Sequence, residues 1–83
     1  MKELLETIVR HLVTHTDAVE VRETSTDTTS LLELRVAHED VGRVIGKHGA
    51  MIEAIRWLLT AVASRSGRRV MLEIVESPAR SSR

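Results

Sequence analysis

The sequence of 83 residues has no cysteine, tyrosine or phenylalanine, and only one proline and four glycines. The lack of cysteine excludes a secreted fold held together by disulfides. Its apolar stretches span a few residues, far short of the about 20 that cross a bilayer, and no apolar signal segment follows Met1. We therefore expect one small cytoplasmic domain, stabilised by a single core.

Aromatic side chains are almost absent, because Trp57 is the only one. This excludes nucleic-acid modules that stack bases on rows of aromatic rings. The formal net charge is zero, which argues against a general polyanion binder. The charges are unevenly placed, however: residues 1–42 contain four basic and nine acidic side chains, whereas residues 43–69 contain six basic and one acidic. The centre of the chain is therefore basic.

Hydrophobic spacing predicts a helix followed by two strands in the first half of the chain. Apolar residues recur at helical spacing from residue 2 to about residue 14, and they are Leu4, Leu5, Ile8, Val9 and Leu12. Residues 18–24 and 31–37 instead alternate apolar and polar side chains, the pattern of half-buried strands. The polar residues 25–30 between them have the composition of a turn.

The second half predicts two helices and a last strand. Asp40 is a plausible N-cap for a short helix over residues 41–45, which Gly46 ends. A second helical stripe runs from residue 51 to near Gly67. Residues 70–75 alternate as a strand that Pro78 terminates. Residues 77–83 have no apolar periodicity and are expected to be a disordered tail.

The segment Gly46-Lys47-His48-Gly49 separates the two helices of the second half. Glycines permit positive φ and leave the main chain open to close approach by another polymer. The following helix directs its free N–H groups and the positive end of its dipole at the same place, and Lys47 adds a full charge. These features predict a site for a phosphate backbone, which Arg43 and Arg56 would extend if they lie near that edge.

Residues 44–55, VIGKHGAMIEAI, resemble the V-I-G-x-x-G-x-x-I-x-x-I signature of the KH domain family. The predicted order of elements, with a helix and a strand before the core, is similar to the bacterial type II form. This resemblance implies an α+β fold of order α-β-β-α-α-β over residues 1–76, with a three-stranded mixed sheet and helices packed on one face. It also implies single-stranded RNA, or less often DNA, lying in a narrow groove.

The resemblance assigns roles to individual residues. Gly46 and Gly49 would shape a clamp for about four nucleotides, and Lys47 and His48 would face the phosphates. Ile45 and Ile52 would form part of an apolar floor beneath the bases. Small bacterial members of the family often have Arg or Lys directly after the second glycine, and here that residue is Ala50. This difference bears on affinity more than on the mode of binding.

Several other interpretations of the same residues stay open. The phosphate loop of an NTPase has four residues between its glycines, whereas three separate Gly42 from Gly46. That loop also has Ser or Thr after its lysine, and here His48 follows Lys47. His11 and His15 are four residues apart on the predicted helix, but no third metal ligand is evident. Trp57 could flank the core, anchor an interface or stack on a base. Three arginines lie near the end of the last predicted helix, and they could be a solvated helix end or an RNA contact: Arg65, Arg68 and Arg69.

We therefore predict a non-catalytic module that binds single-stranded RNA and needs no cofactor, because no catalytic or metal-binding constellation appears in the sequence. The resemblance implies a role in post-transcriptional regulation or RNA chaperoning. The alternative is a protein-interaction subunit, since small KH proteins of this kind are associated with self-pairing and with a larger KH-containing partner of the Jag type. The two functions are compatible, because pairing two clamps raises the effective concentration of each.

Overall fold

The computed structural model describes residues 1–76, so the tail expected at residues 77–83 lies outside the described residues. Three α-helices and three strands follow one another as predicted: α1 (Lys2–Arg10), β1 (Glu20–Ser25), β2 (Thr29–Val36), α2 (Val41–Ile45), α3 (Ala50–Ser64) and β3 (Arg69–Glu76). Among the described residues, no helix has both the length and the hydrophobicity that a membrane span requires.

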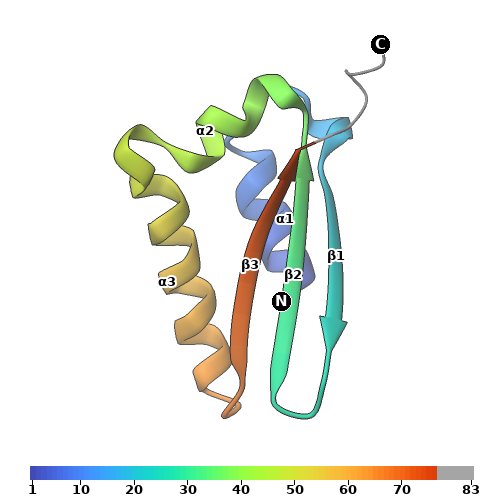
Figure 1. Ribbon diagram of the computed structural model, residues 1–83, viewed down its shortest axis with the longest axis vertical. Helices are drawn as coiled ribbons and strands as arrows, with labels where there is room; N and C mark the ends of the chain where they lie inside the picture. Colours follow the sequence, from blue (N-terminus) through green and yellow to red (C-terminus); the bar gives the residue numbers. More distant parts are fainter. Residues whose placement is uncertain (77–83) are drawn as a thin grey trace.

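The strands form a mixed sheet in the order β1-β2-β3. β1 and β2 make an antiparallel hairpin, and β3 returns parallel to β2 after the two helices α2 and α3. Figure 1 shows α1 behind the strands, α3 alongside β3, and α2 at one end of the sheet. The predicted α+β fold of order α-β-β-α-α-β, with helices on one face of a three-stranded sheet, is confirmed.

The core lies between the sheet and the helices. Alternate residues of β2 are buried, which places Leu32, Leu34 and Val36 on the face that the helices cover. Side chains from α1, α2, α3 and the neighbouring strands complete the same cluster: Leu5, Val9, Val19, Val21, Val44, Ile52, Ile55, Leu59 and Leu72. Each fully buried aliphatic side chain contributes about 1.5 to 3 kcal/mol to folding, so this one layer holds the fold together.

The prediction for α1 is wrong at its C-terminal end, because the helix stops at Arg10 and not near residue 14. Leu12 and Val13 still pack against the core, from a turn beyond the helix. The amides of residues 11–13 still donate to carbonyl oxygens of Ile8 and Val9, but those of Thr14 and His15 donate to the side chain of Asp40, so the chain does not continue as a helix. His11 and His15 therefore do not share a helix, and a metal pair at helical spacing is not formed.

Arg68 ties the end of α3 to the β1–β2 turn. Its guanidinium donates four hydrogen bonds of 2.9 to 3.1 Å, to the carbonyl oxygens of Thr26, Asp27 and Thr29 and to Oγ of Ser30. Arg68 is therefore neither a solvated end of the helix nor a free cation for RNA. It stabilises the hairpin through contacts about 40 residues away in the sequence.

Candidate nucleic-acid interface

The loop from Gly46 to Gly49 turns the chain sharply between α2 and α3. Both glycines have positive φ, 79° at Gly46 and 76° at Gly49. The N–H of Gly49 donates to the carbonyl of Gly46 at 3.1 Å, which closes the turn. A Cβ atom at residue 46 would lie 2.6 Å from the Cβ of Met51, whereas one at residue 49 would meet nothing within 4 Å. Glycine is required for space at residue 46 and for φ at both positions.

His48, between the two glycines, also adopts the left-handed conformation, with φ 58° and ψ 24°. For a residue with a side chain this conformation costs about 1 to 2 kcal/mol. Backbone strain of this kind concentrates at ligand clamps and active sites, where the surrounding structure maintains it. The side chains of Lys47 and His48 are both exposed, as predicted from the sequence.

The loop carries unpaired positive groups. The backbone N–H groups of Lys47 and His48 make no hydrogen bond with any residue from 1 to 76, and the ammonium of Lys47 has no ion-pair partner in that range. α3 begins directly after the loop, so the positive end of its dipole lies there too. A site of this character attracts anions such as phosphate.

Arg43 lies on α2, three residues before the loop, and its Nε forms an ion pair of 3.4 Å with Oδ1 of Asp40. Burial by itself would raise the pKa of Asp40, but hydrogen bonds from the backbone amides of Thr14 and His15 and from the His15 ring lower that pKa to about 2. Asp40 is therefore ionised at neutral pH. Its negative charge faces the interior, while the guanidinium of Arg43 is exposed.

A groove of about 300 Å³ runs between α3 and the free edge of β3, and its lining comprises Arg56, Leu59, Thr60, Val70, Met71 and Leu72. Arg56 spans this groove, because it donates to the carbonyl oxygen of Leu72 and to a carboxylate oxygen of Glu53, each at 3.3 Å. Arg56 thus lies by the groove, about one and a half to two helical turns beyond the loop. Its terminal nitrogens already have protein partners.

The two isoleucines expected in the floor lie in different environments. Ile45 ends α2 with 36% of its surface exposed, whereas Ile52 is 6% exposed and belongs to the core. Ile52 therefore supports the first turn of α3 from inside. The half of the groove wall that β3 supplies, Val70, Met71 and Leu72, was not predicted from the sequence. The available signal was Met71, a large apolar residue that is exposed on the outward face of a strand.

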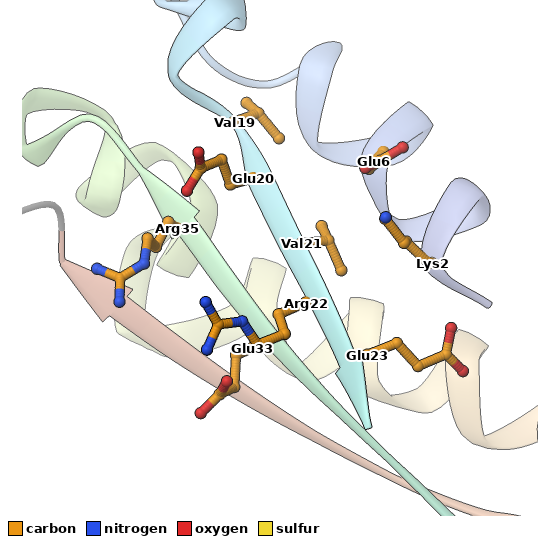
Figure 2. Close-up of a pocket in the computed structure, with 9 residues that line it drawn as sticks. All are labelled: Lys2, Glu6, Val19, Glu20, Val21, Arg22, Glu23, Glu33 and Arg35. Atoms are coloured by element: carbon orange, nitrogen blue, oxygen red, sulfur yellow. The ribbon is translucent and has the colours of Figure 1, made fainter. Parts of the chain in front are cut away.

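A larger groove, of about 500 Å³, lies at the opposite edge of the sheet, and residues of α1, β1 and β2 line it. Figure 2 shows Val19 and Val21 pointing toward α1, with Arg22 and Arg35 on the opposite side of the strands. Its lining contains more acidic than basic side chains, namely Glu6, Glu20, Glu23 and Glu33 against Lys2, Arg22 and Arg35. The mixed charge is poorly suited to a phosphate backbone, so the smaller groove between α3 and β3 is the better candidate.

The family described as KhpA/KhpB, KH domain matches residues 2–74, which is nearly all of the described chain. The chain belongs to this family of KH domains. A protein of Clostridium acetobutylicum named RNA-binding protein KhpA is 47% identical over 75 residues, covering 90% of this chain and 100% of the relative. A relative of the same name in Chlamydia pneumoniae is 47% identical over 76 residues, covering 92% of this chain and 97% of the relative. Another, in Listeria monocytogenes, is 45% identical over 76 residues, covering 92% of this chain and all of the relative. No solved structure matches the chain significantly.

Membership of this KH family accounts for the kind of site that the chain contains. The family is non-enzymatic, so binding and not catalysis is the function to explain. Within residues 1–76, no three side chains of the types that ligate metals lie close enough to hold an ion. The candidate interface comprises the loop at residues 46–49, Arg43 beside it, and the groove between α3 and β3.

Proposed function

We propose that this KH domain binds single-stranded RNA, with the sugar-phosphate backbone against the Gly46–Gly49 loop and the bases in the groove between α3 and β3. The observation that carries the proposal is the exposed loop, in which the N–H groups of Lys47 and His48 have no hydrogen-bond partner among residues 1–76. The curated relatives are named RNA-binding proteins, which supports RNA as the ligand.

Each part of the interface then has a separate task. The free N–H groups, Lys47 and Arg43 hold phosphates, which carry no sequence information. The groove holds bases against Val70 and Met71, and Arg56 gives this surface a polar edge. Affinity from backbone capture with modest sequence preference suits a role in post-transcriptional regulation or RNA chaperoning. The bound strand would be a cellular transcript, so we expect the protein to act in the cytoplasm.

The direct test is the double variant Lys47→Asp/His48→Asp. Both side chains are exposed, so the variant should keep its circular dichroism spectrum and thermal midpoint while RNA binding falls at least a hundredfold. A matched control is Lys2→Asp/His11→Asp, which changes the same residue types at exposed positions of α1 and just beyond it. Binding that persists in the first variant, or is lost equally in the control, would contradict the proposal.

Salt dependence provides a second measure of the same contacts. For single-stranded nucleic acid, the logarithm of the binding constant falls by about 0.7 per logarithmic unit of salt for each phosphate neutralised. A clamp that holds two or three phosphates should therefore give a slope between about −1.4 and −2.1. Removing Lys47 alone should reduce the slope by about 0.7, whereas a slope near zero would exclude backbone capture.

The outer face of α3 favours a second function as a protein-interaction subunit. Trp57 is 74% exposed and Leu58 40%, and together with Ala54 and Ala61 they form an apolar stripe at helical spacing. A stripe of this kind on the surface of a small protein is typical of an interface. It could pair with a second copy of the chain or with a larger KH protein of the Jag type. Sedimentation of the protein with and without RNA distinguishes the two functions, because a monomer without RNA affinity would favour docking to another protein.

A further inference from the structure

Asp40 is one of two polar side chains that are buried among residues 1–76, and only 1% of its surface is exposed. It occupies the N-cap position of α2, but its carboxylate makes no hydrogen bond to that helix. Asp40 is therefore the N-cap residue of α2 as predicted, but its side chain does not form a capping hydrogen bond. The carboxylate contacts the segment between α1 and β1 and the side chain of Arg43, so the buried charge requires an explanation other than capping.

The two carboxylate oxygens have different partners. Oδ2 accepts hydrogen bonds from the backbone N–H of His15 at 2.9 Å and lies 3.1 Å from Nδ1 of its ring. Oδ1 accepts the N–H of Thr14 at 3.0 Å and forms the ion pair with Nε of Arg43 at 3.4 Å. One buried anion thus joins the segment after α1 to the surface of α2.

α2 has five residues, fewer than a helix needs to be stable by itself in water. The helix ends at Ile45, and the residue that follows, Gly46, is the first residue of the loop. Anything that fixes the start of α2 therefore also fixes where the loop begins. Val44 anchors the inner side of this helix in the core, and the contacts of Asp40 hold its first turn.

The ion pair also sets the direction of Arg43. Because the contact uses Nε, the two terminal nitrogens of the guanidinium have no partner among residues 1–76. These nitrogens can donate two parallel hydrogen bonds to a phosphate, which Lys cannot do. The acidic groups at the start of this segment are Glu39, which is exposed, and Asp40 itself.

We propose that Asp40 is a positioning residue of the RNA site, which presents the terminal nitrogens of Arg43 to a backbone phosphate through the contact with Nε. The proposal rests on the proposed RNA-binding function and adds a residue that is itself too deeply buried to touch RNA. It makes the affinity for RNA depend on the Asp40–Arg43 contact.

A double-mutant cycle with Asp40→Asn and Arg43→Ala tests this dependence. Arg43→Ala should weaken RNA binding about tenfold, and Asp40→Asn should weaken it three- to tenfold in the wild-type background. In the Arg43→Ala background, Asp40→Asn should change RNA affinity less than twofold while still lowering the thermal midpoint. An equal loss of affinity in both backgrounds would mean that Asp40 acts through the fold in general, and would overturn the proposal.

His15→Ala is the matched control, because it removes a partner of Asp40 on the side away from Arg43. It should reduce stability but leave RNA affinity within twofold of the wild type. If Asp40→Asn does not fold, the variant Arg43→Lys provides the test. Its RNA affinity should fall nearly as far as that of Arg43→Ala, and an RNA affinity equal to that of the wild type would overturn the proposal.

An NMR measurement without RNA separates this proposal from the proposed function. The Nε–H of Arg43 should show restricted motion in the wild type, in contrast to that of Arg65, which is exposed and has no partner in residues 1–76. Equal mobility of the two groups would overturn the positioning role even if RNA binds. If the protein binds no RNA but Arg43 is restricted, the proposed function fails and the structural contact stands.

Discussion

A side chain at residue 46 and the side chain of Met51 exclude each other, because a Cβ at residue 46 would lie 2.6 Å from the Cβ of Met51. Met51 belongs to the first turn of α3, so it cannot move away without moving the helix. The absence of a side chain at Gly46 therefore allows α3 to start close to the end of α2. This contact sets the shape of the loop that receives the phosphate backbone in our proposal.

Gly46→Ala should destabilise the protein by about 2 to 4 kcal/mol. About 1 to 3 kcal/mol comes from the backbone, because φ 79° with ψ 172° is a region that is essentially restricted to glycine, and the remainder from overpacking against Met51. RNA affinity should fall as well, because α3 must shift relative to the loop. Denaturant unfolding and RNA titration of the same preparation measure both effects.

Gly49→Ala is the control for backbone strain without a clash, since a Cβ there meets nothing within 4 Å. It should cost only about 1 to 2 kcal/mol. If the two variants are equally stable, the close approach of Met51 does not restrict residue 46 in solution.

Arg68→Ala should loosen the β1–β2 turn. The guanidinium of Arg68 serves three carbonyl oxygens and one hydroxyl, so its removal should cost about 2 kcal/mol of folding free energy. Hydrogen exchange should accelerate at the hairpin amides, including the N–H of Thr26 that donates to Thr29. The loop at residues 46–49 should keep its conformation, because these contacts lie at the end of the sheet away from it (Figure 1). Arg65→Ala removes an equal charge nearby and should leave both stability and exchange unchanged.

The order of elements could be predicted because most of its signals are local. The bounds of α2 follow from Asp40 before it and Gly46 after it, and the strands follow from side chains that alternate over one buried face. The end of α1 could not be predicted, since a carboxylate 26 residues further along the chain attracts the amide of Thr14. Long-range hydrogen bonds of this kind leave no periodic pattern in the sequence.

The loop was similarly accessible from the sequence, because two glycines around a lysine form a contiguous motif. The groove was not, because α3 and β3 each supply half of its wall. Hydrophobic periodicity identifies Ile52 as apolar but does not distinguish a residue in the floor of a groove from one in the core. Arg56 was predicted as a possible phosphate ligand, but its contact with the carbonyl of Leu72 depends on the sheet edge being unpaired.

Acid should remove the stabilisation that Asp40 provides. Its pKa is about 2 in the folded protein against an ordinary value of 3.8, so the folded state favours the ionised carboxylate. The resulting stability is fully present above about pH 4 and is lost as the pH falls through about 2, to a total of at most about 2 kcal/mol. Urea unfolding of the wild type and Asp40→Asn should therefore show a gap in stability that is constant above pH 5 and narrows toward pH 2. A gap that stays constant over the whole range would show that ionisation of Asp40 does not stabilise the fold.

The exposed stripe on α3 predicts that two copies of the protein pair through this helix. Trp57 is the only aromatic residue of the chain, so its fluorescence reports on this face alone. If two copies pair through α3, emission from Trp57 should shift to shorter wavelength as the protein concentration rises, in step with the mass measured by sedimentation. Ala61→Glu places a charge within the stripe at an exposed position, and it should weaken pairing at least tenfold without unfolding the monomer.

Pairing should also affect RNA binding in a way that depends on RNA length. Two clamps joined in a dimer raise the effective concentration of the second site for a strand long enough to reach both. Ala61→Glu should therefore weaken binding of a long RNA more than tenfold and leave binding of an oligonucleotide of about four residues unchanged. Thr7→Glu, at an exposed position of α1, should have neither effect. An equal loss for short and long RNA would place Ala61 in the binding groove itself, and the α3 stripe would then belong to the RNA interface and not to a protein partner.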